Sequence, residues 1–355
     1  MAESRPILTN GVEEDQEMNV IKTIRASEWW GYKLAPLLAI GYATVLKSGK
    51  SLMEAGPYLL YILLAMVLGA AYVSVINDIT DVEDDLAIGK KNRMANVPPS
   101  RRWIFPALAL LAGAAYIASF YPHVLIMALA TMPWIAFSCY SIPPVRLKKR
   151  GIPGVLADAA GAHIFTSLFI VASMSYYTGE PMDWIWFGAV GVWALCYGLR
   201  GILWHMFYDR DNDIASGTPT YGTQTDPERF RPREWVILSV EMLALGVMLW
   251  RIAGPLPVIF LVFYLLFVAA SWRKLGFKIV IILMPPGQPY PYLIFLADFY
   301  QVFLPLSLLL RAALTSRYDW IILFAHLVLF SWSIRRLLRF AFRIAKVPGA
   351  EASRS

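Results

Sequence analysis

The sequence is poor in cysteine and in charged residues. It has two cysteines in 355 residues, and both Cys139 and Cys196 lie in apolar runs, so they are better interpreted as small core residues than as a disulfide or a metal site. Charged residues make up 16% of the chain, whereas a soluble domain has about 25%. A secretory signal peptide is not apparent, because the first twenty residues carry five acids and no apolar segment. These features argue against a disulfide-stabilised secreted domain and against an ordinary soluble protein.

Apolar residues are abundant instead, at 58% of the chain with a mean hydropathy of +0.53. A membrane-spanning helix needs about 20 mostly apolar residues. The sequence therefore predicts an all-α fold: a polytopic membrane helical bundle with nine to ten transmembrane helices. The stretch 276–291 is interrupted by MPPGQPYP, so we expect a loop or a re-entrant segment there. The ten candidate spans lie near residues 30–47, 57–76, 103–121, 123–140, 155–175, 184–207, 235–252, 255–271, 292–311 and 319–338.

The positions of lysine and arginine indicate how these spans are oriented. With a cytoplasmic N-terminus, 25 of the 32 basic residues fall on inner segments and 5 on outer ones, while Lys33 and Arg200 lie within helices. The positive-inside rule then places both termini and the acidic loops in the cytoplasm, and it favours an even number of spans. The same distribution accounts for the net charge of +7, so we expect no nucleic acid partner.

The acidic run NDITDVEDD, residues 77–85, directly follows the second predicted span. If the helix continues, Asp78, Asp81 and Asp85 fall within roughly 60° of one another, at the negative end of the helix dipole. Three carboxylates on one face repel one another unless a hard cation such as Mg²⁺ binds them, and Asn77 adds a neutral oxygen ligand. The alternative is a solvated acidic loop, which would need neither the helical spacing nor the asparagine.

A second acidic run, YDRDNDIASGTPTYG at residues 208–222, follows the sixth predicted span. Asp209 and Asp213 share a helical face with His205, one turn earlier, whereas Asp211 points the opposite way. A calcium loop is not indicated, because the twelfth position counted from Asp209 is Thr220 rather than a glutamate. The two clusters could face each other across one cavity, and each could hold a metal ion.

Basic residues follow both the first acidic run and the fourth span. Lys90, Lys91 and Arg93 come directly after the first run, and YSIPPVRLKKRG at residues 140–151 adds four more. Arginine suits bidentate phosphate recognition and lysine acts as a point charge. We expect Arg93 and Arg146 to contact a ligand. Ordinary positive-inside residues are the better interpretation for Arg101, Arg102, Lys149 and Arg150.

Several charged residues lie within the predicted spans, where they are functional candidates by default. His163 and Arg200 stay unassigned, and we expect Asp298 to pair within the bundle. The many aromatic residues include interfacial ones such as Trp30, and others could line an apolar tunnel or stabilise an allylic cation. The full set of charged candidates is Lys33, Asp158, His163, Arg200, His205, Glu241 and Asp298.

Four motifs together resemble the UbiA superfamily of intramembrane prenyltransferases. Asn77-Asp78-x-x-Asp81-x-x-x-Asp85 is similar to the first motif of the family, and Asp209-x-x-x-Asp213 is similar to the second. The stretch YSIPPVRLKKRG looks like the basic loop after the fourth helix, and IRASEWWGYKLAPLLA resembles the opening helix. The similarity covers roughly residues 20–230, and the first motif is its most specific part.

This resemblance implies a helical bundle around a central cavity that is capped on the cytoplasmic side. In the family, Mg²⁺ ions on the two aspartate motifs hold a polyprenyl diphosphate whose tail enters a lipid-facing tunnel. The C–O bond then ionises and an acceptor attacks the allylic cation. Carried over to this chain, the expected catalytic residues are Asp78, Asp81, Asp209 and Asp213. The expected metal ligands are Asn77, Asp78, Asp81, Asp85, Asp209 and Asp213, and the expected diphosphate-binding residues are Asn77, Lys91, Arg93, Arg146 and Lys148.

The departures from the family pattern concern mainly the acceptor. Arg93 is followed by Met94 rather than proline, and the 276–291 insertion and the last helix lie outside the resemblance. The acceptor, an aromatic or lipid small molecule, is therefore unidentified. Alternatives are a membrane terpene cyclase with the same motifs, a phosphoribosyl-type transfer onto a polyprenyl phosphate, and an ion-coupled transporter. The expected organisation is a cytoplasmic segment 1–28, one transmembrane domain 29–342 in the lipid bilayer, and a basic tail 343–355.

Overall fold

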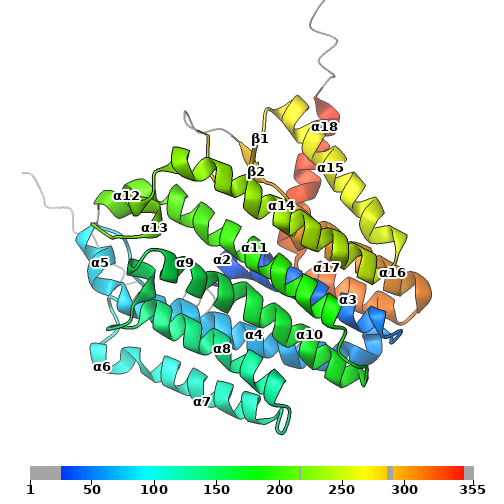
Figure 1. The fold of residues 1–355 in the computed structure, drawn as a ribbon, viewed down its shortest axis with the longest axis horizontal. Helices are drawn as coiled ribbons and strands as arrows, with labels where there is room; N and C mark the ends of the chain where they lie inside the picture. The colour runs from blue at the N-terminus through cyan, green and yellow to red at the C-terminus, as the bar shows by residue number, and fades with distance from the viewer. Residues whose placement is uncertain (1–24, 216, 286–290, 348–355) are drawn as a thin grey trace, which may run out of the picture.

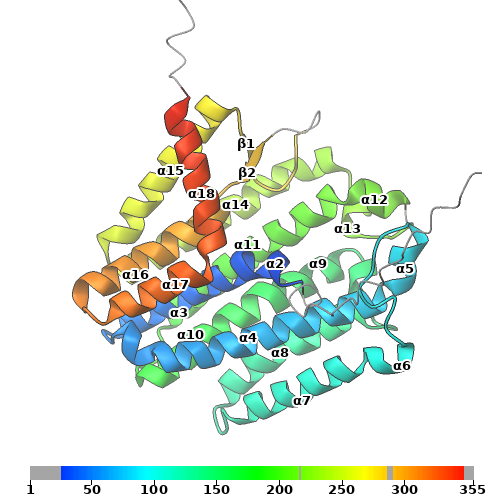
Figure 2. The ribbon, with the colours of Figure 1, turned by 180° about the vertical axis from the view of Figure 1, so that it is seen from behind.

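The structure is a computed structural model that describes residues 25–215, 217–285 and 291–347. The described residues form a bundle of long helices that lie side by side, with α7 along one edge and α15 with α18 along the other (Figures 1 and 2). Most of the predicted N-terminal segment 1–28 and the last residues of the predicted tail, 348–355, lie outside the described residues. The basic residues 343–346 are not in a separate tail, because they belong to the last helix.

The first half of the bundle carries the first acidic run and the basic loop. Pro57 and Pro133 lie inside long helices there without ending them. The elements are α2 (Ala26–Trp29), η1 (Trp30–Leu34), α3 (Ala35–Lys47), α4 (Leu52–Thr80), α5 (Val82–Ala87), α6 (Pro99–Arg102), α7 (Ile104–Ala118), α8 (Val124–Ser141), η2 (Leu147–Lys149), α9 (Ile152–Ala159), η3 (Ala160–Ile164) and α10 (Phe165–Thr178).

The second half carries the second acidic run and the only described strands. α11 is central and packs against α9, η3, α10 and α14. The elements are α11 (Trp184–Tyr208), α12 (Arg210–Ala215), α13 (Tyr221–Gln224), α14 (Pro227–Ile252), α15 (Pro255–Leu275), β1 (Lys278–Val280), β2 (Tyr292–Ile294), η4 (Phe299–Phe303), α16 (Leu304–Thr315), α17 (Asp319–Leu329) and α18 (Ser331–Lys346).

The described residues confirm the helical membrane fold but not the number of spans. Six helices are long and apolar enough to cross a membrane, or seven if the bent pair α17 and α18 counts as one span. The predicted span 319–338 is interrupted by a 77° bend between those two helices. The predicted span 292–311 begins too early, because its first residues form β2 and helix begins only at Phe299. A count of nine to ten therefore stays a prediction.

Residues 276–285 and 291–296 are not helical, and charged side chains of neighbouring helices bind their backbone. β1 pairs in parallel with β2. Arg200 of α11 donates hydrogen bonds to the carbonyl oxygens of Ile281 and Phe295. A carboxylate oxygen of Glu234 accepts from the N–H groups of Ile282 and Leu283, at 3.2 and 3.0 Å. Irregular backbone within a membrane protein requires such protein partners, so this arrangement agrees with the loop or re-entrant segment that the sequence predicts.

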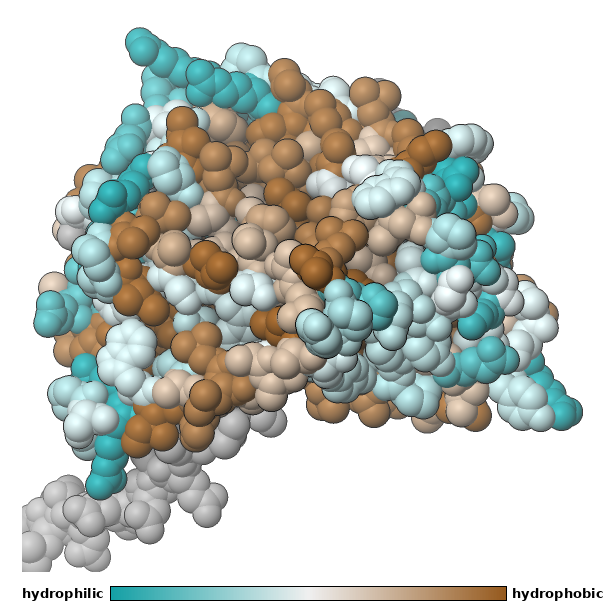
Figure 3. All heavy atoms as spheres, turned by 60° about the horizontal axis from the view of Figure 1, so that its bottom comes forward, coloured by the Kyte–Doolittle hydropathy of each residue, from teal (hydrophilic) through white to brown (hydrophobic). Residues whose placement is uncertain are grey.

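The outer surface of the bundle is largely apolar, as expected for helices that face lipid. Figure 3 shows hydrophobic side chains over much of one face, with hydrophilic residues gathered toward its edges. On α7 alone, Leu108 and Leu111 are 60% and 69% exposed. Exposed leucines at this density would be a liability in water, so the surface supports an integral, multi-pass membrane protein.

Candidate active site

The two acidic motifs have the same local backbone structure. Each lies where a long helix ends and a short one begins, with an aspartate at the junction: Asp81 after α4 and Asp209 after α11. The N–H of Asp85 donates to the carbonyl oxygen of Asp81 at 2.8 Å, and the N–H of Asp213 donates to that of Asp209 at 2.9 Å. Asp81 and Asp85 of the first motif therefore have the same backbone geometry as Asp209 and Asp213 of the second.

The loops that follow the two motifs are equivalent as well. Gly89 and Gly217 have φ values of 71° and 66°, in the left-handed region that glycine adopts without strain. The next N–H groups, of Lys90 and Thr218, both donate at 2.8 Å to the carbonyl oxygen five residues earlier. This glycine-containing helix end turns the chain back toward the site in both halves. The two acidic runs thus share a repeated local structure.

The first motif does not form the continuous helical face that its spacing predicts. α4 ends at Thr80, and Asp81 has φ −106° and ψ 3°, outside the helical region. Among the described residues, no group of three or more His, Cys, Asp or Glu side chains is positioned to hold a metal ion. The carboxylates are separated because each of them pairs with different basic or amide side chains.

Asp78 is the most buried acid of the first motif, at 5% exposure. Arg25, which precedes α2, and Arg93, which follows the motif, approach its two carboxylate oxygens at 3.4 Å each. Arg25 has a left-handed backbone with φ 57°, a conformation that is unfavourable for a residue with a Cβ. A strained backbone that places a cation beside a buried acid is typical of a functional site.

Asp81 and Asp84 bind the basic loop. Arg146 donates from one guanidinium nitrogen to the carboxylates of both aspartates, at 2.9 Å each, and to the backbone oxygen of Thr80. Lys148 also pairs with Asp81, and Lys149 pairs with Asp84 at 2.6 Å. Although burial alone would raise it, Lys149 and Arg146 hold the pKa of Asp84 below its usual range. Burial lowers the pKa of Lys148, and Asp81 opposes this shift.

Asp85 has a smaller set of partners. Asn92 donates to its carboxylate and to the backbone oxygen of Asp78, both at 2.8 Å, and so ties the following loop to the motif. Lys90 pairs with Asp85 at 3.5 Å. Lys91 is exposed, and no contact in the described part of the chain links it to either motif. The structure therefore places Lys90, rather than Lys91, beside the acids.

The second motif has fewer basic partners than the first. Asp209 lies 3.4 Å from His205 Nδ1, and Asp213 accepts a hydrogen bond from the Thr220 hydroxyl at 2.9 Å. Burial raises the pKa of Asp213, with a contribution from Asp209, while Thr220, His205 and Lys90 lower it. Lys90 thus interacts with both motifs. Asp211 is exposed, as its position on the helix predicts.

A cavity of about 1090 Å³ runs from the two motifs into the bundle. Its lining reaches Asn77, the first residue of one motif, and His205, one turn before the other. The side-chain oxygen of Asn77 accepts a hydrogen bond from the buried Ser141 hydroxyl. Tyr140, also in the lining, interacts electrostatically with both Asp81 and Asp213. Asn77 and His205 therefore place one end of the cavity beside both motifs, although none of the motif aspartates lines it.

The cavity has an apolar arm between α4, α7, α8 and α10. Its walls are aliphatic and aromatic. The ring centroids of Tyr61 (α4) and Tyr116 (α7) are 4.7 Å apart, and those of Tyr116 and Phe169 (α10) are 6.2 Å apart. Trp134 packs so closely on Gly113 that a Cβ there would lie 2.7 Å from the indole. The residues that line this arm include Tyr61, Leu64, Leu68, Gly113, Tyr116, Leu129, Trp134 and Phe169.

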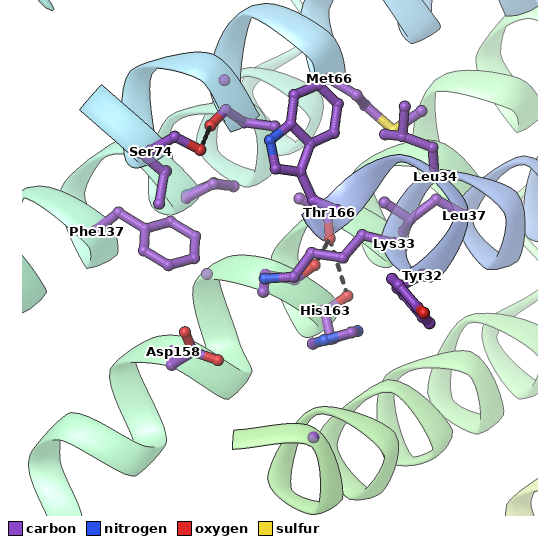
Figure 4. A pocket seen from close by; sticks show the side chains of 18 of the residues that line it. Tyr32, Lys33, Leu34, Leu37, Met66, Ser74, Phe137, Asp158, His163 and Thr166 are labelled. Atoms are coloured by element: carbon purple, nitrogen blue, oxygen red, sulfur yellow. Dashed lines mark hydrogen bonds between the residues drawn. The ribbon is translucent and has the colours of Figure 1, made fainter. Parts of the chain in front are cut away.

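A second group of polar side chains lines the middle of the cavity, and π-helical turns carry it. η1, η3 and η4 are π-helical, and they contribute Lys33, His163 and Gln301 to the lining. Such turns are frequent at functional sites. Figure 4 shows Lys33 extending from η1 into the space bordered by Thr166 and Asp158. His163 packs edge-on against Tyr197 at 5.1 Å.

The far wall of the cavity comes from the C-terminal part of the chain. The buried Asp298 forms an ion pair there with the partly exposed Arg336, which agrees with the expected pairing of Asp298 within the bundle. The side-chain oxygen of Gln301 is buried and has no hydrogen-bond donor among the described residues. Phe340 of α18 completes this wall. A ligand group that donates a hydrogen bond would satisfy Gln301.

Sequence reasoning missed several partners of the acids. Arg25 lies 53 residues from Asp78, and Ser141 lies 64 residues from Asn77, so no local pattern could pair them. Asn92 could have been found, because it follows the motif directly. Lys149 was interpreted as an ordinary inner-face lysine, but it contacts Asp84.

The fold and the paired motifs define a polytopic membrane protein of the intramembrane prenyltransferase class. A model of the UbiA prenyltransferase family matches residues 34–279, and the chain belongs to this family. No curated protein matches the chain. Among solved structures, a UbiA homolog from Archaeoglobus fulgidus superposes with a TM-score of 0.55 and 16% identity, over 85% of this chain and 98% of that one. The same homolog bound to GPP and Mg²⁺ gives 0.51 and 13%, over 86% and 99%. At such identities the likeness shows the fold.

Proposed function

We propose that the protein is a Mg²⁺-dependent membrane prenyltransferase that ionises a polyprenyl diphosphate and transfers the prenyl group to a small acceptor. The observation that carries this proposal is the pair of matched aspartate motifs at one end of a cavity whose other arm is apolar. One end of the cavity suits a charged headgroup with metal ions, and the apolar arm suits an isoprenoid tail. Family membership and the A. fulgidus structures bound to GPP or DMAPP with Mg²⁺ support the same substrate class.

The donor set at the motifs fits Mg²⁺. The candidate ligands offer only oxygen, which hard cations prefer. Mg²⁺ usually binds one or two carboxylates together with water and substrate phosphate, so it needs no preformed cage of three acids. Bound there, the ions would neutralise the charge that develops on the departing diphosphate. The residues that would hold them are Asn77, Asp78, Asp81, Asp85, Asp209 and Asp213.

The basic residues beside the first motif would bind the diphosphate itself. In the structure Arg146 and Lys148 are paired with Asp81, and Arg93 is paired with Asp78. A diphosphate with its metal ions would replace these ion pairs. The aspartates would then bind the metal ions, and the arginine and lysine side chains would bind phosphate oxygens. Charge would stay balanced in both states. Arg25, Lys90 and Lys149 join the predicted set on geometry, and Lys91 has only its sequence position in its favour.

The acceptor would occupy the polar middle of the cavity. Lys33, His163 and Gln301 line the cavity, and they offer a positive charge, an imidazole ring and a hydrogen-bond acceptor. In a balanced transfer, the C–O bond of the prenyl diphosphate breaks and the diphosphate leaves with the electron pair. A bond then forms from the acceptor to the prenyl carbon, and the acceptor loses a proton.

The test is to incubate the purified protein with farnesyl or geranylgeranyl diphosphate and Mg²⁺ and to measure pyrophosphate. Release that requires a membrane lipid extract or an added aromatic compound is expected for a transferase. Release without acceptor, with a cyclic hydrocarbon product, would show a terpene cyclase instead. No release from any prenyl diphosphate, in wild type and Asp78→Ala alike, would contradict both.

A further inference from the structure

α18 carries its charges differently from the other long helices. It has five basic residues and no acid within Ser331–Lys346. A helix of this length extends about 24 Å, and as part of a span it would place several arginines in hydrocarbon, which is costly. The 77° bend after α17 turns it out of that path. α18 is therefore not the second half of a transmembrane helix.

The contacts of α18 place it across the ends of other helices. The indole N–H of Trp30 donates to the carbonyl oxygen of Leu329 at 2.8 Å, just before α18 begins. Trp332 packs against Tyr32 at a ring distance of 6.4 Å. At the other end, Lys274 in the last turn of α15 donates to the Ile344 carbonyl at 3.3 Å. Figure 2 shows α18 leaving α17 and running beside α15. Because helix ends lie near a membrane surface, α18 lies along one.

Three faces of α18 differ in character. Ser333 and Leu337 are buried against the bundle. A second face is apolar and exposed, with Leu338 at 51% and Phe342 at 66%. The third face is basic and exposed. Apolar and basic faces side by side are the pattern of a helix that lies in the plane of a membrane interface.

The end of α15 extends the basic face into a larger basic cluster. Neither 271–285 nor 331–347 contains an acid. Arg336 is excluded from the cluster because it pairs with Asp298 inside. Within the described ranges, none of the remaining exposed basic residues of the two segments forms a salt bridge. These seven residues, the basic cluster, are Arg273, Lys274, Lys278, Arg335, Arg339, Arg343 and Lys346.

We propose that α18 is an interfacial anchor whose basic cluster binds phospholipids with anionic headgroups. The arginines and lysines would contact lipid phosphates and headgroup charges, while Leu338 and Phe342 would lie among the upper acyl chains. Charge complementarity identifies the partner, because a dense positive surface at a membrane interface attracts anionic lipid headgroups. The proposal concerns the outer surface, so it stands apart from the reaction in the cavity.

The test is native mass spectrometry of the full-length protein in mixed micelles with equal phosphatidylglycerol and phosphatidylcholine. The variant R335Q/R339Q/R343Q/K346Q removes four charges of the cluster. A matched control removes four exposed charges elsewhere, as R101Q/R229Q/R233Q/R317Q. One basic residue near an anionic surface contributes roughly a fivefold preference. We expect wild type and control to retain more phosphatidylglycerol than phosphatidylcholine. In the cluster variant the ratio of bound phosphatidylglycerol to bound phosphatidylcholine should be at least about fivefold lower.

Equal retention of the two lipids by wild type would overturn the proposal. So would a cluster variant that keeps the wild-type ratio, or a control that loses as much as the cluster variant. If the fourfold variant fails to fold, R339Q/R343Q provides the same comparison with half the charge removed. Because the readout is bound lipid, a negative result is distinguishable from failure of the proposed prenyl transfer.

Discussion

The buried ion pair between α11 and α14 gives the sharpest stability prediction. Arg200 and Glu241 lie 2.7 Å apart with side chains 2% and 0% exposed. The Tyr300 hydroxyl donates to the same Glu241 oxygen at 2.8 Å. Glu241→Gln keeps the shape of the side chain and leaves the guanidinium buried without a counter-charge. Breaking a buried pair in this way costs about 3–5 kcal/mol.

A second pair provides the matched control. Arg231 and Glu228 lie 2.8 Å apart, with the same side-chain types, but their side chains are 40% and 71% exposed. Water solvates both charges there, so Glu228→Gln should leave stability unchanged within error. Burial is the main difference between the two substitutions.

The assay is thermal unfolding of both variants in one detergent, followed by tryptophan fluorescence and by size-exclusion chromatography after heating. We expect the apparent Tm of Glu241→Gln to fall by on the order of 10 °C. Arg200 also binds the carbonyl oxygens of Ile281 and Phe295, so the chain at these two residues should become sensitive to protease at lower temperature. A Glu241→Gln variant that melts with wild type, or two variants with the same loss, would refute the reasoning.

Three further predictions follow. Gly222→Ala would place a Cβ 2.3 Å from the Met206 carbonyl oxygen. The loop after the second motif should therefore shift, and pyrophosphate release should fall at least about tenfold. In the control Gly246→Ala the new Cβ meets nothing within 4 Å, so pyrophosphate release should match wild type. Although burial raises it, hydrogen bonds from a backbone N–H, Arg251 and Lys47 lower the pKa of Asp183 to about 2. Its stabilisation is therefore complete above about pH 4 and is lost as the pH falls toward 2. Melting curves of wild type and Asp183→Asn should converge in that range, and a constant gap would contradict the assignment. Removal of divalent metal with EDTA should abolish pyrophosphate release, and excess Mg²⁺ should restore it; release that persists without metal would argue against a metal-dependent site.

Helical periodicity and hydropathy were sufficient to predict the fold class and the location of the acids. Asp209 and Asp213 lie one helical turn apart, and Asp211 is exposed, because short-range geometry decides both. The same reasoning failed at Asp81, where a continuous helix was assumed. The helix breaks there, and Arg146, which is 65 residues away in sequence, binds the partly buried carboxylate of Asp81. Contacts at that separation depend on the packing of α8 against α4, which no local pattern contains.

The C-terminal quarter of the chain was predicted least well. Hydropathy predicts a span at 319–338, but window averages do not register that the exposed arginines of α18 lie on one face while Arg336 pairs with Asp298. The placement of 292–296 as β2 and a turn depends on side chains such as Arg200 that satisfy its backbone from another helix. Packing of this kind is a tertiary property, so this wall of the cavity could not be predicted.

The most direct test of the two-motif site compares two aspartates within one short helix. Asp213 is partly buried and bonded to Thr220, whereas Asp211 is exposed. Pyrophosphate release from geranylgeranyl diphosphate with Mg²⁺ is measured for Asp213→Asn and Asp211→Asn, under the acceptor condition in which wild type turns over. A loss on the order of 100-fold in Asp213→Asn, with Asp211→Asn close to wild type, is the predicted result. Wild-type activity in Asp213→Asn, or equal loss in both variants, would contradict it.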